Sequence, residues 1–219
     1  SKQPRRNLDV LMKYRNDKRY LGLSNMIDKD NKSIYGLEFS YETIPNELNL
    51  FDYDAFKQYK GDFYCVVTNL LTGQPEYMKY TGDDRTNTVL KATCALPMLF
   101  PPIIINDVPY MDGGLSDSIP YLKAIEDGCD RIIVVLTRQS GYTKTTSRST
   151  KAIAYSYRNQ YPKLTETMLT RASRYYESLK GLDQYVKEGR IITIQPTTSK
   201  GFSRLEKDKN KILSMYNDG

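Results

Sequence analysis

Hydrophobic and polar positions follow different periods along the chain, and these periods predict where helices and strands lie. Over the first sixty residues, apolar side chains at helical spacing predict a helix over residues 7–15 and a short helix over residues 52–59. Between the two, glycines and the Ile44-Pro45-Asn46 stretch interrupt any period. We therefore expect residues 16–51 to contain little regular structure.

Two β-hairpins are predicted in the middle of the chain. The first joins a strand-type run at residues 63–68 to residues 76–80 through a turn that contains Gly73. The second joins residues 103–105 to residues 108–111 through Asn106 and Asp107, whose side chains tolerate positive φ. A helix that starts at Asp83 or Asp84 and runs to about Cys94 separates the two hairpins.

The rest of the chain alternates between helical and strand patterns. Pro120 and Gly128 bracket a predicted helix, and residues 131–137 form a nearly continuous apolar run of the kind found in a strand buried on both faces of a parallel sheet. The order of hairpin, helix and buried strand favours an α/β fold. Further expectations are a polar loop at residues 140–151, an amphipathic helix at 161–179 that breaks at Gly181, a strand at 191–194 and a helix at 205–216.

Composition narrows the chemistry that this chain can perform. There is no histidine among the 219 residues, so a Ser-His-Asp triad, a Cys-His dyad and a histidine-based zinc site cannot be built from it. The three cysteines are far apart and lack a C-x-x-C spacing, which favours reduced thiols over a disulfide framework or a structural zinc site. Any acid–base step must use Asp, Glu, Lys, Tyr or Cys.

Charge is unevenly distributed. The net charge is +6, and residues 139–219 hold 15 of the 32 basic side chains but only 7 of the 26 acidic ones. Acidic side chains lie among the cations and no nucleic-acid motif is present, so we expect a solvated basic face rather than a nucleic-acid site. Weak contact with an anionic membrane surface is the second interpretation. Without an apolar spanning run or a signal-peptide pattern, we expect the protein in the cytoplasm, and its oligomeric state stays open.

The most informative local motif is Asp112-Gly113-Gly114, which directly follows the second predicted hairpin. A carboxylate at the exit of a strand can project from the end of the sheet, where ligands bind in open α/β folds. Two consecutive glycines let the chain turn sharply beside it. Asp-Gly is also an ordinary turn dipeptide, so the tripeptide alone favours a turn over a catalytic site.

The longer context changes that interpretation. It consists of residues 67–73, 92–102, 110–114, 118–120 and 124–135 in this order. Over about residues 61–137 the chain resembles the C-terminal half of the patatin-like acyl hydrolases. In that family a serine in a G-x-S-x-G elbow attacks the acyl carbonyl, and the aspartate of a D-G-G motif is its only catalytic partner. The resemblance implies that Asp112 is the base and orienting group of a Ser-Asp dyad, with Gly113 and Gly114 shaping its loop.

The chain departs from the family pattern upstream of that motif. Three G-x-S triplets occur, around Ser24, Ser116 and Ser203, and none has the closing glycine of the elbow. Ser116 is the best of the three by its place between a strand and a helix, although a loop or cap role is favoured over a nucleophile. We therefore expect the nucleophile and the oxyanion loop to lie upstream of Ser1. Residues 1–219 would then be the C-terminal portion of the hydrolase domain and would be inactive alone.

These observations lead to one prediction of fold and function. We expect a single domain over residues 1–219, with three α/β/α layers around a mainly parallel sheet and an antiparallel hairpin before the D-G-G loop. By resemblance, the complete protein is a serine hydrolase that acts on lipid or other acyl esters and needs neither a metal nor an organic cofactor. The alternative is a noncatalytic binding or regulatory domain that acts through its basic C-terminal face.

Overall fold

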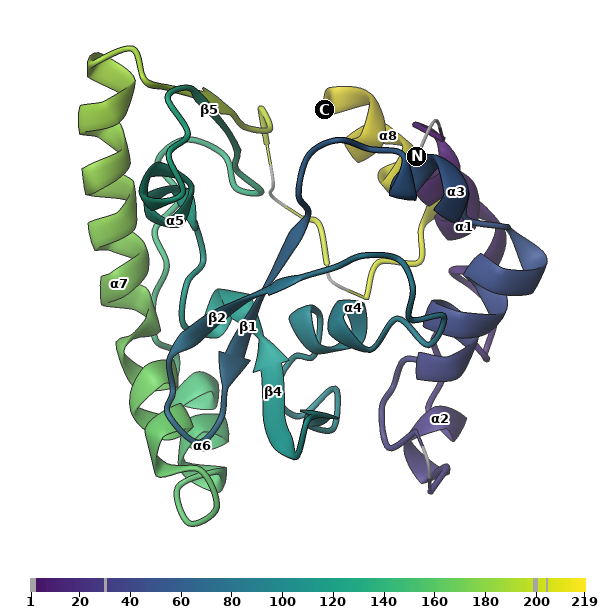
Figure 1. Ribbon diagram of the computed structural model, residues 1–219. Helices are drawn as coiled ribbons and strands as arrows, with labels where there is room; N and C mark the ends of the chain where they lie inside the picture. The colour runs from purple at the N-terminus through teal and green to yellow at the C-terminus, as the bar shows by residue number, and fades with distance from the viewer. Residues whose placement is uncertain (1–2, 30, 199–200, 204) are drawn as a thin grey trace.

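A four-stranded antiparallel sheet forms the centre of the computed structural model, which describes residues 3–29, 31–198, 201–203 and 205–219 (Figure 1). The strands are β1 (Tyr64–Asn69), β2 (Pro75–Lys79), β3 (Ile103–Ile105) and β4 (Val108–Asp112), and they lie in the order β2-β1-β4-β3. Each neighbouring pair is antiparallel. Both predicted hairpins are confirmed, and Asn106 and Asp107 in the second turn have the expected positive φ, 49° and 63°.

A separate two-stranded sheet contains the parallel pairing. It joins β5 (Ile132–Val135) to β6 (Ile191–Ile194). The α/β class is confirmed, but the expectation of a mainly parallel sheet needs correction. Parallel neighbours require a long crossover connection, and among the described strands only β5 and β6 are joined in this way. The two hairpins instead meet side by side through β1 and β4, which makes the larger sheet antiparallel.

The prediction that β5 is buried on both faces is wrong. Ile133 and Val135 are 64% and 69% exposed, while Ile132 and Val134 on the other face pack against a cluster that includes Tyr121 and Leu182. Alternation of this kind shows that, within the described residues, helices cover one face of the small sheet.

Within the described residues, four helical segments precede the sheet. They are α1 (Arg6–Tyr14), α2 (Ser24–Ile27), the π-helix η1 (Phe39–Leu48) and α3 (Tyr53–Lys57). Both predicted helices are confirmed, and the Asp52 side chain caps α3 by accepting the Ala55 N–H at 2.8 Å. The expectation of little regular structure between them is wrong because η1 occupies ten residues there, with Pro45 inside it.

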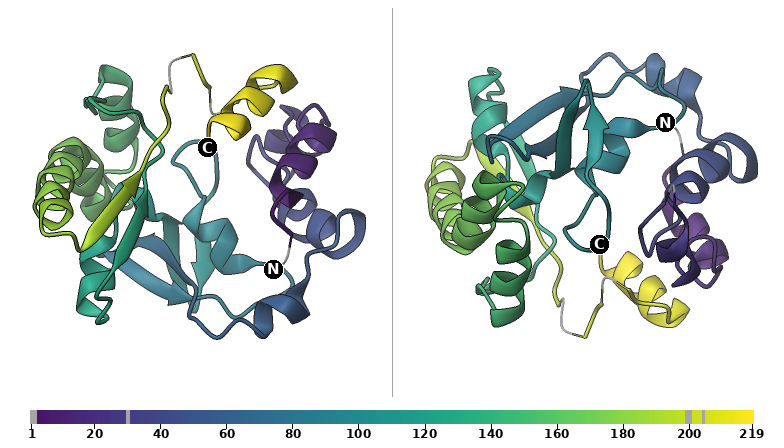
Figure 2. Two further views of the ribbon diagram at one scale, coloured as in Figure 1. Left: turned by 90° about the horizontal axis from the view of Figure 1, so that it is seen from above. Right: turned by 90° about the horizontal axis from the view of Figure 1, so that it is seen from below.

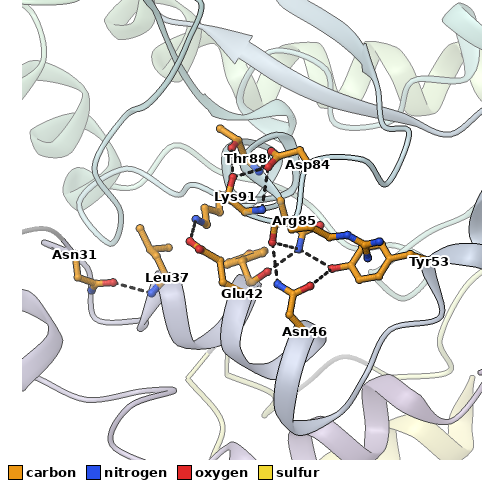
Figure 3. A network of polar contacts seen from close by, with 12 residues as sticks. Asn31, Leu37, Glu42, Asn46, Tyr53, Asp84, Arg85, Thr88 and Lys91 are labelled. Carbon is orange, nitrogen blue, oxygen red and sulfur yellow. Dashed lines mark hydrogen bonds and ion pairs between the residues drawn. The ribbon is translucent and has the colours of Figure 1, made fainter.

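A network of polar contacts ties η1 to the segment before α4 (Thr88–Thr93) (Figure 3). The Asn46 amide donates to the Arg85 carbonyl at 2.9 Å and accepts from the Tyr53 hydroxyl at 3.0 Å. The Asp84 carboxylate accepts the Thr88 N–H at 2.8 Å, as an N-terminal cap would. Helix α4 nevertheless begins later than predicted, because Asn87 lies in the left-handed region with φ of 54°.

The remaining helices are α5 (Tyr121–Glu126), α6 (Arg148–Ser156), α7 (Pro162–Lys187) and α8 (Lys209–Asp218). Helix α6 begins inside the predicted loop, with Ser147 as its cap. The four-stranded sheet lies between α6 and α7 on one side and the N-terminal helices on the other (Figure 2). Helix α8 returns to pack on α1, where the Arg15 Nε donates to the Glu206 carbonyl at 2.5 Å. No helix in the described ranges is long and apolar enough to cross a membrane.

The main hydrophobic core joins the sheet to helices from distant parts of the chain. Val67 and Met111 of the sheet are fully buried against Ala92 of α4, and Leu164 of α7 belongs to the same cluster. Burying an aliphatic side chain of this size contributes roughly 1.5–3 kcal/mol. The core therefore fixes both the sheet and the N-terminal half of α7 around the start of the Asp112 loop.

Helix α7 continues through Gly181, so the predicted break there is wrong. A Cβ at residue 181 would overlap the Tyr121 hydroxyl, and the glycine lets α7 approach α5 closely.

We expect Gly181→Ala to lower stability by about 1–2 kcal/mol through this overlap. In a Tyr121→Phe background the same substitution is expected to raise stability by up to about 1 kcal/mol, because alanine favours the helix. Urea denaturation of the double-mutant cycle measures both effects, and equal costs in the two backgrounds would contradict the explanation.

Candidate functional site

Asp112 is the last residue of β4 and lies beside two other segments. Its N–H donates to the Ala95 carbonyl after α4 at 2.9 Å, and its carbonyl accepts from the Thr68 hydroxyl of β1 at 2.8 Å. Its Oδ1 accepts the Gly114 N–H at 2.7 Å and thereby caps the short 3-10 helix η2 (Gly113–Leu115). The backbone of the predicted catalytic aspartate is thus held from both sides, while its carboxylate is turned back over its own loop.

The two glycines after Asp112 serve different packing requirements. Gly113 is buried under β1, where a Cβ would overlap the Val66 carbonyl group and lie 2.7 Å from the Val66 Cβ. At Gly114, a Cβ would lie 2.9 Å from Asp112 Oδ1 and 3.4 Å from the Arg171 guanidinium. The first glycine therefore allows the loop to reach the sheet, and the second keeps the space between a carboxylate and a cation open.

Ser116, one of the three serines in G-x-S triplets, lies in the same loop. Its hydroxyl is 2.8 Å from the Thr68 hydroxyl and donates to the Gly113 carbonyl at 3.3 Å. These contacts are those of a loop-bracing serine, which agrees with the favoured interpretation from the sequence. Ser24 begins α2 near the other end of the chain, and Ser203 lies before α8, where its carbonyl accepts the Glu206 N–H at 3.0 Å.

Two arginines of α7 reach the Asp112 loop from the far side. Arg171 Nε donates to the Gly114 carbonyl at 2.6 Å. Arg174 donates to the carbonyls of Leu115 at 2.7 Å and Ser116 at 3.2 Å, and also to the Thr167 carbonyl and the Thr170 hydroxyl. Burial lowers the pKa of Arg174, and the negative charges of Asp117 and Glu166 oppose that shift. These hydrogen bonds from Arg171 and Arg174 to the loop all end on backbone carbonyls.

A cavity of about 820 Å³ lies between the N-terminal helices and the α4 region. Its walls are formed mainly by aromatic and aliphatic side chains, among them Tyr41, Phe56, Leu90, Leu96 and Phe100. Cys94 also lines the cavity, and part of its surface is exposed to solvent. Burial raises the pKa of the Cys94 thiol, and the negative charge of Asp112 adds to this rise. The Asp112 N–H bonds to the carbonyl of Ala95, the residue after Cys94, so the backbone of Asp112 lies next to the Cys94 end of the cavity.

The fold and this loop together define an α/β protein with an aspartate at a strand exit beside an apolar cavity. Residues 6–125 match the family model described as patatin-like phospholipase. The chain therefore belongs to the patatin-like phospholipase family, a family of lipid acyl hydrolases. Residues 161–219 match a second family model, described only as a domain of unknown function. No curated protein matches the chain significantly.

The family match confirms the resemblance inferred from the sequence but changes its extent. The resemblance was expected over about residues 61–137, and the match begins at residue 6 and ends at residue 125. The expected restriction to the C-terminal part of the family finds no support in it. The N-terminal helices, including η1, are therefore part of the family segment.

The structure brings the predicted site residues together in one loop, with Gly113 and Gly114 beside the Asp112 carboxylate. Sequence reasoning missed Arg171 and Arg174. Their spacing of three residues places both on one face of a helix, and this was the available signal. It did not reveal which of the many basic residues of the C-terminal third reach the loop.

Proposed function

We propose that this chain contributes the aspartate of a Ser-Asp dyad to a hydrolase that cleaves acyl esters of lipids. Asp112 accepts the proton of the nucleophilic serine as it attacks the acyl carbonyl, and passes this proton to the alcohol that leaves. Asp112 then accepts a proton from the water that attacks the acyl-enzyme and returns it to the serine as the fatty acid is released. A dyad of this kind needs no histidine, in agreement with a composition that contains none. The single observation that carries the proposal is the D-G-G loop at the exit of β4 in a chain of this family.

The cavity beside Cys94 supports a lipid as the substrate. Its volume of about 820 Å³ lies within the range of small-molecule sites, and its lining is predominantly apolar. Aromatic and aliphatic walls favour an acyl chain because they remove its methylene groups from water. We propose that the acyl chain lies in this cavity, with the ester at its Cys94 end.

We further propose that the nucleophile lies on a segment outside residues 1–219. No serine of the sequence stands in a G-x-S-x-G elbow. Ser116, the nearest candidate, bonds with Thr68 and the Gly113 carbonyl. The proposal also implies that the 219-residue chain lacks the oxyanion donors that supply a large part of the rate in acyl transfer.

Covalent labelling tests this assignment. A fluorophosphonate probe is added to the 219-residue chain and, in parallel, to the natural full-length protein, and labelling is measured by intact mass. We expect labelling of the full-length protein only, because the probe requires an activated serine. Labelling of the 219-residue chain would place the nucleophile within it, with Ser116 the first residue to map. If neither protein is labelled, the proposal fails and a noncatalytic binding role through the basic C-terminal face becomes the better explanation.

A further inference from the structure

The segment of unknown function and the family segment meet at the Asp112 loop. Helix α7 lies entirely within residues 161–219, whereas the loop lies within residues 6–125. Three α7 side chains on one face donate to backbone carbonyls of the family segment. Thr167 contacts Gly73 at 2.8 Å, Arg171 contacts Gly114, and Arg174 contacts Leu115 and Ser116.

The hydrogen bonds of Arg174 hold its side chain between α7 and the Asp112 loop. Its guanidinium has five N–H donors, and four acceptors surround it, two in the loop and two in α7 itself. The side chain is partly buried, so its desolvated charge depends on these partners. An arginine engaged in this way holds two consecutive loop carbonyls in fixed positions, and the planar fork needed for that is not available to lysine.

Arg171 acts closer to the carboxylate. Its Nη2 and Asp112 Oδ1 both lie within 3.4 Å of the point where a Cβ of residue 114 would stand. Its Nε holds the Gly114 carbonyl, while the N–H of the same glycine donates to Asp112 Oδ1 at 2.7 Å. The Gly114 peptide groups therefore connect the Arg171 guanidinium to the Asp112 side chain.

From these contacts we infer that α7 of the segment of unknown function positions the Asp112 loop, with Arg171 and Arg174 as the positioning residues. The inference rests on the proposed role of Asp112. It means that residues 161–219 belong to the hydrolase unit and orient its carboxylate, rather than forming an independent binding module. The contact of α8 with α1 and the Arg15–Glu206 hydrogen bond join the two segments at a second place.

Hydrogen exchange of the Gly114 amide, measured by NMR on the 15N-labelled 219-residue chain, tests the inference. This amide reports the hydrogen bond that orients Asp112, and the Leu70 amide, bonded to the Pro109 carbonyl at 3.0 Å, reports the integrity of the sheet. In Arg171→Met we expect exchange at Gly114 to become at least about tenfold faster while exchange at Leu70 is unchanged. Arg171→Lys is expected to recover part of the protection.

Two further variants complete the test. Arg174→Lys keeps the charge but loses the fork, and we expect it to accelerate Gly114 exchange in the same way. Lys180→Met, which removes an exposed cation from the same helix, is expected to leave both amides unchanged. Unchanged Gly114 exchange in both arginine variants would overturn the inference. Equal acceleration at Gly114 and Leu70 would also overturn it, because the arginines would then stabilise the fold without positioning the loop.

The exchange measurement needs no nucleophile, so it separates this inference from the proposed function. If the probe labels neither protein but the arginine variants accelerate exchange at Gly114, the dyad assignment is wrong and the positioning role of α7 is supported. If labelling succeeds and Gly114 does not respond, the dyad stands and the positioning role is wrong.

Discussion

Asp112→Asn is expected, under the proposed function, to lower ester hydrolysis by a factor of about 10³–10⁴ in a protein that contains these residues and the proposed nucleophile. The asparagine keeps an oxygen that can accept the Gly114 N–H, so the loop retains its conformation. It has no carboxylate, however, and cannot accept the serine proton. The effect should appear in kcat for a p-nitrophenyl acyl ester, with thermal unfolding close to that of the parent protein.

Asp117→Asn is the matched control for this experiment. Asp117 is a carboxylate of the same segment, and it accepts the Tyr77 hydroxyl at 2.7 Å and the Ile119 N–H at 3.2 Å. Removing its charge should change hydrolysis by less than about tenfold, because it has no place in the proposed proton transfer. Comparable losses in the two variants would show that negative charge in the loop matters in general, and the assignment of Asp112 as the base would then fail.

Local signals explain why the loop itself could be predicted. The turn residues Asn106 and Asp107 fix the hairpin, and the hairpin ends at Asp112, so the exit of the carboxylate from the strand follows from neighbouring residues alone. The role of Asp112, in contrast, came from a resemblance and not from spacing. The Asp112→Asn and Asp117→Asn variants test that role directly.

Features that depend on distant segments could not be predicted. The helical period of α7 was clear, but Gly181 was interpreted as a break because glycine usually interrupts a helix. The sequence does not show that the Tyr121 hydroxyl occupies the space beside it, which is why a glycine stands there. Likewise, the apolar run of β5 indicated burial on both faces, although whether a second face is covered depends on what packs there. Arg171 and Arg174 belong to the same class of feature, since their acceptors lie 57 to 59 residues away in the chain.

Gly113→Ala is expected to lower the stability of the chain by about 3 kcal/mol or more. The added Cβ would overlap the Val66 carbonyl group, which is backbone of β1 and cannot turn aside as a flexible side chain can. Relief requires the loop to move away from the sheet, which also disturbs the pairing of Val67 with Asp112. For a chain of this size the cost corresponds to a fall in Tm of about 6–12 °C, measurable by calorimetry or circular dichroism.

Gly114→Ala separates packing from positioning within the same loop. Its Cβ would meet side-chain atoms, the Asp112 carboxylate at 2.9 Å and the Arg171 guanidinium at 3.4 Å, and these can shift without moving the sheet. We therefore expect a cost of only about 1 kcal/mol in stability, because the crowding is relieved by small side-chain movements. Hydrolysis should nevertheless fall strongly in the natural protein, since the relief displaces the carboxylate. The opposite order of Tm values for the two alanine variants would show that β1 moves more easily than the Asp112 and Arg171 side chains. Packing on the sheet would then constrain the loop less than these side chains do.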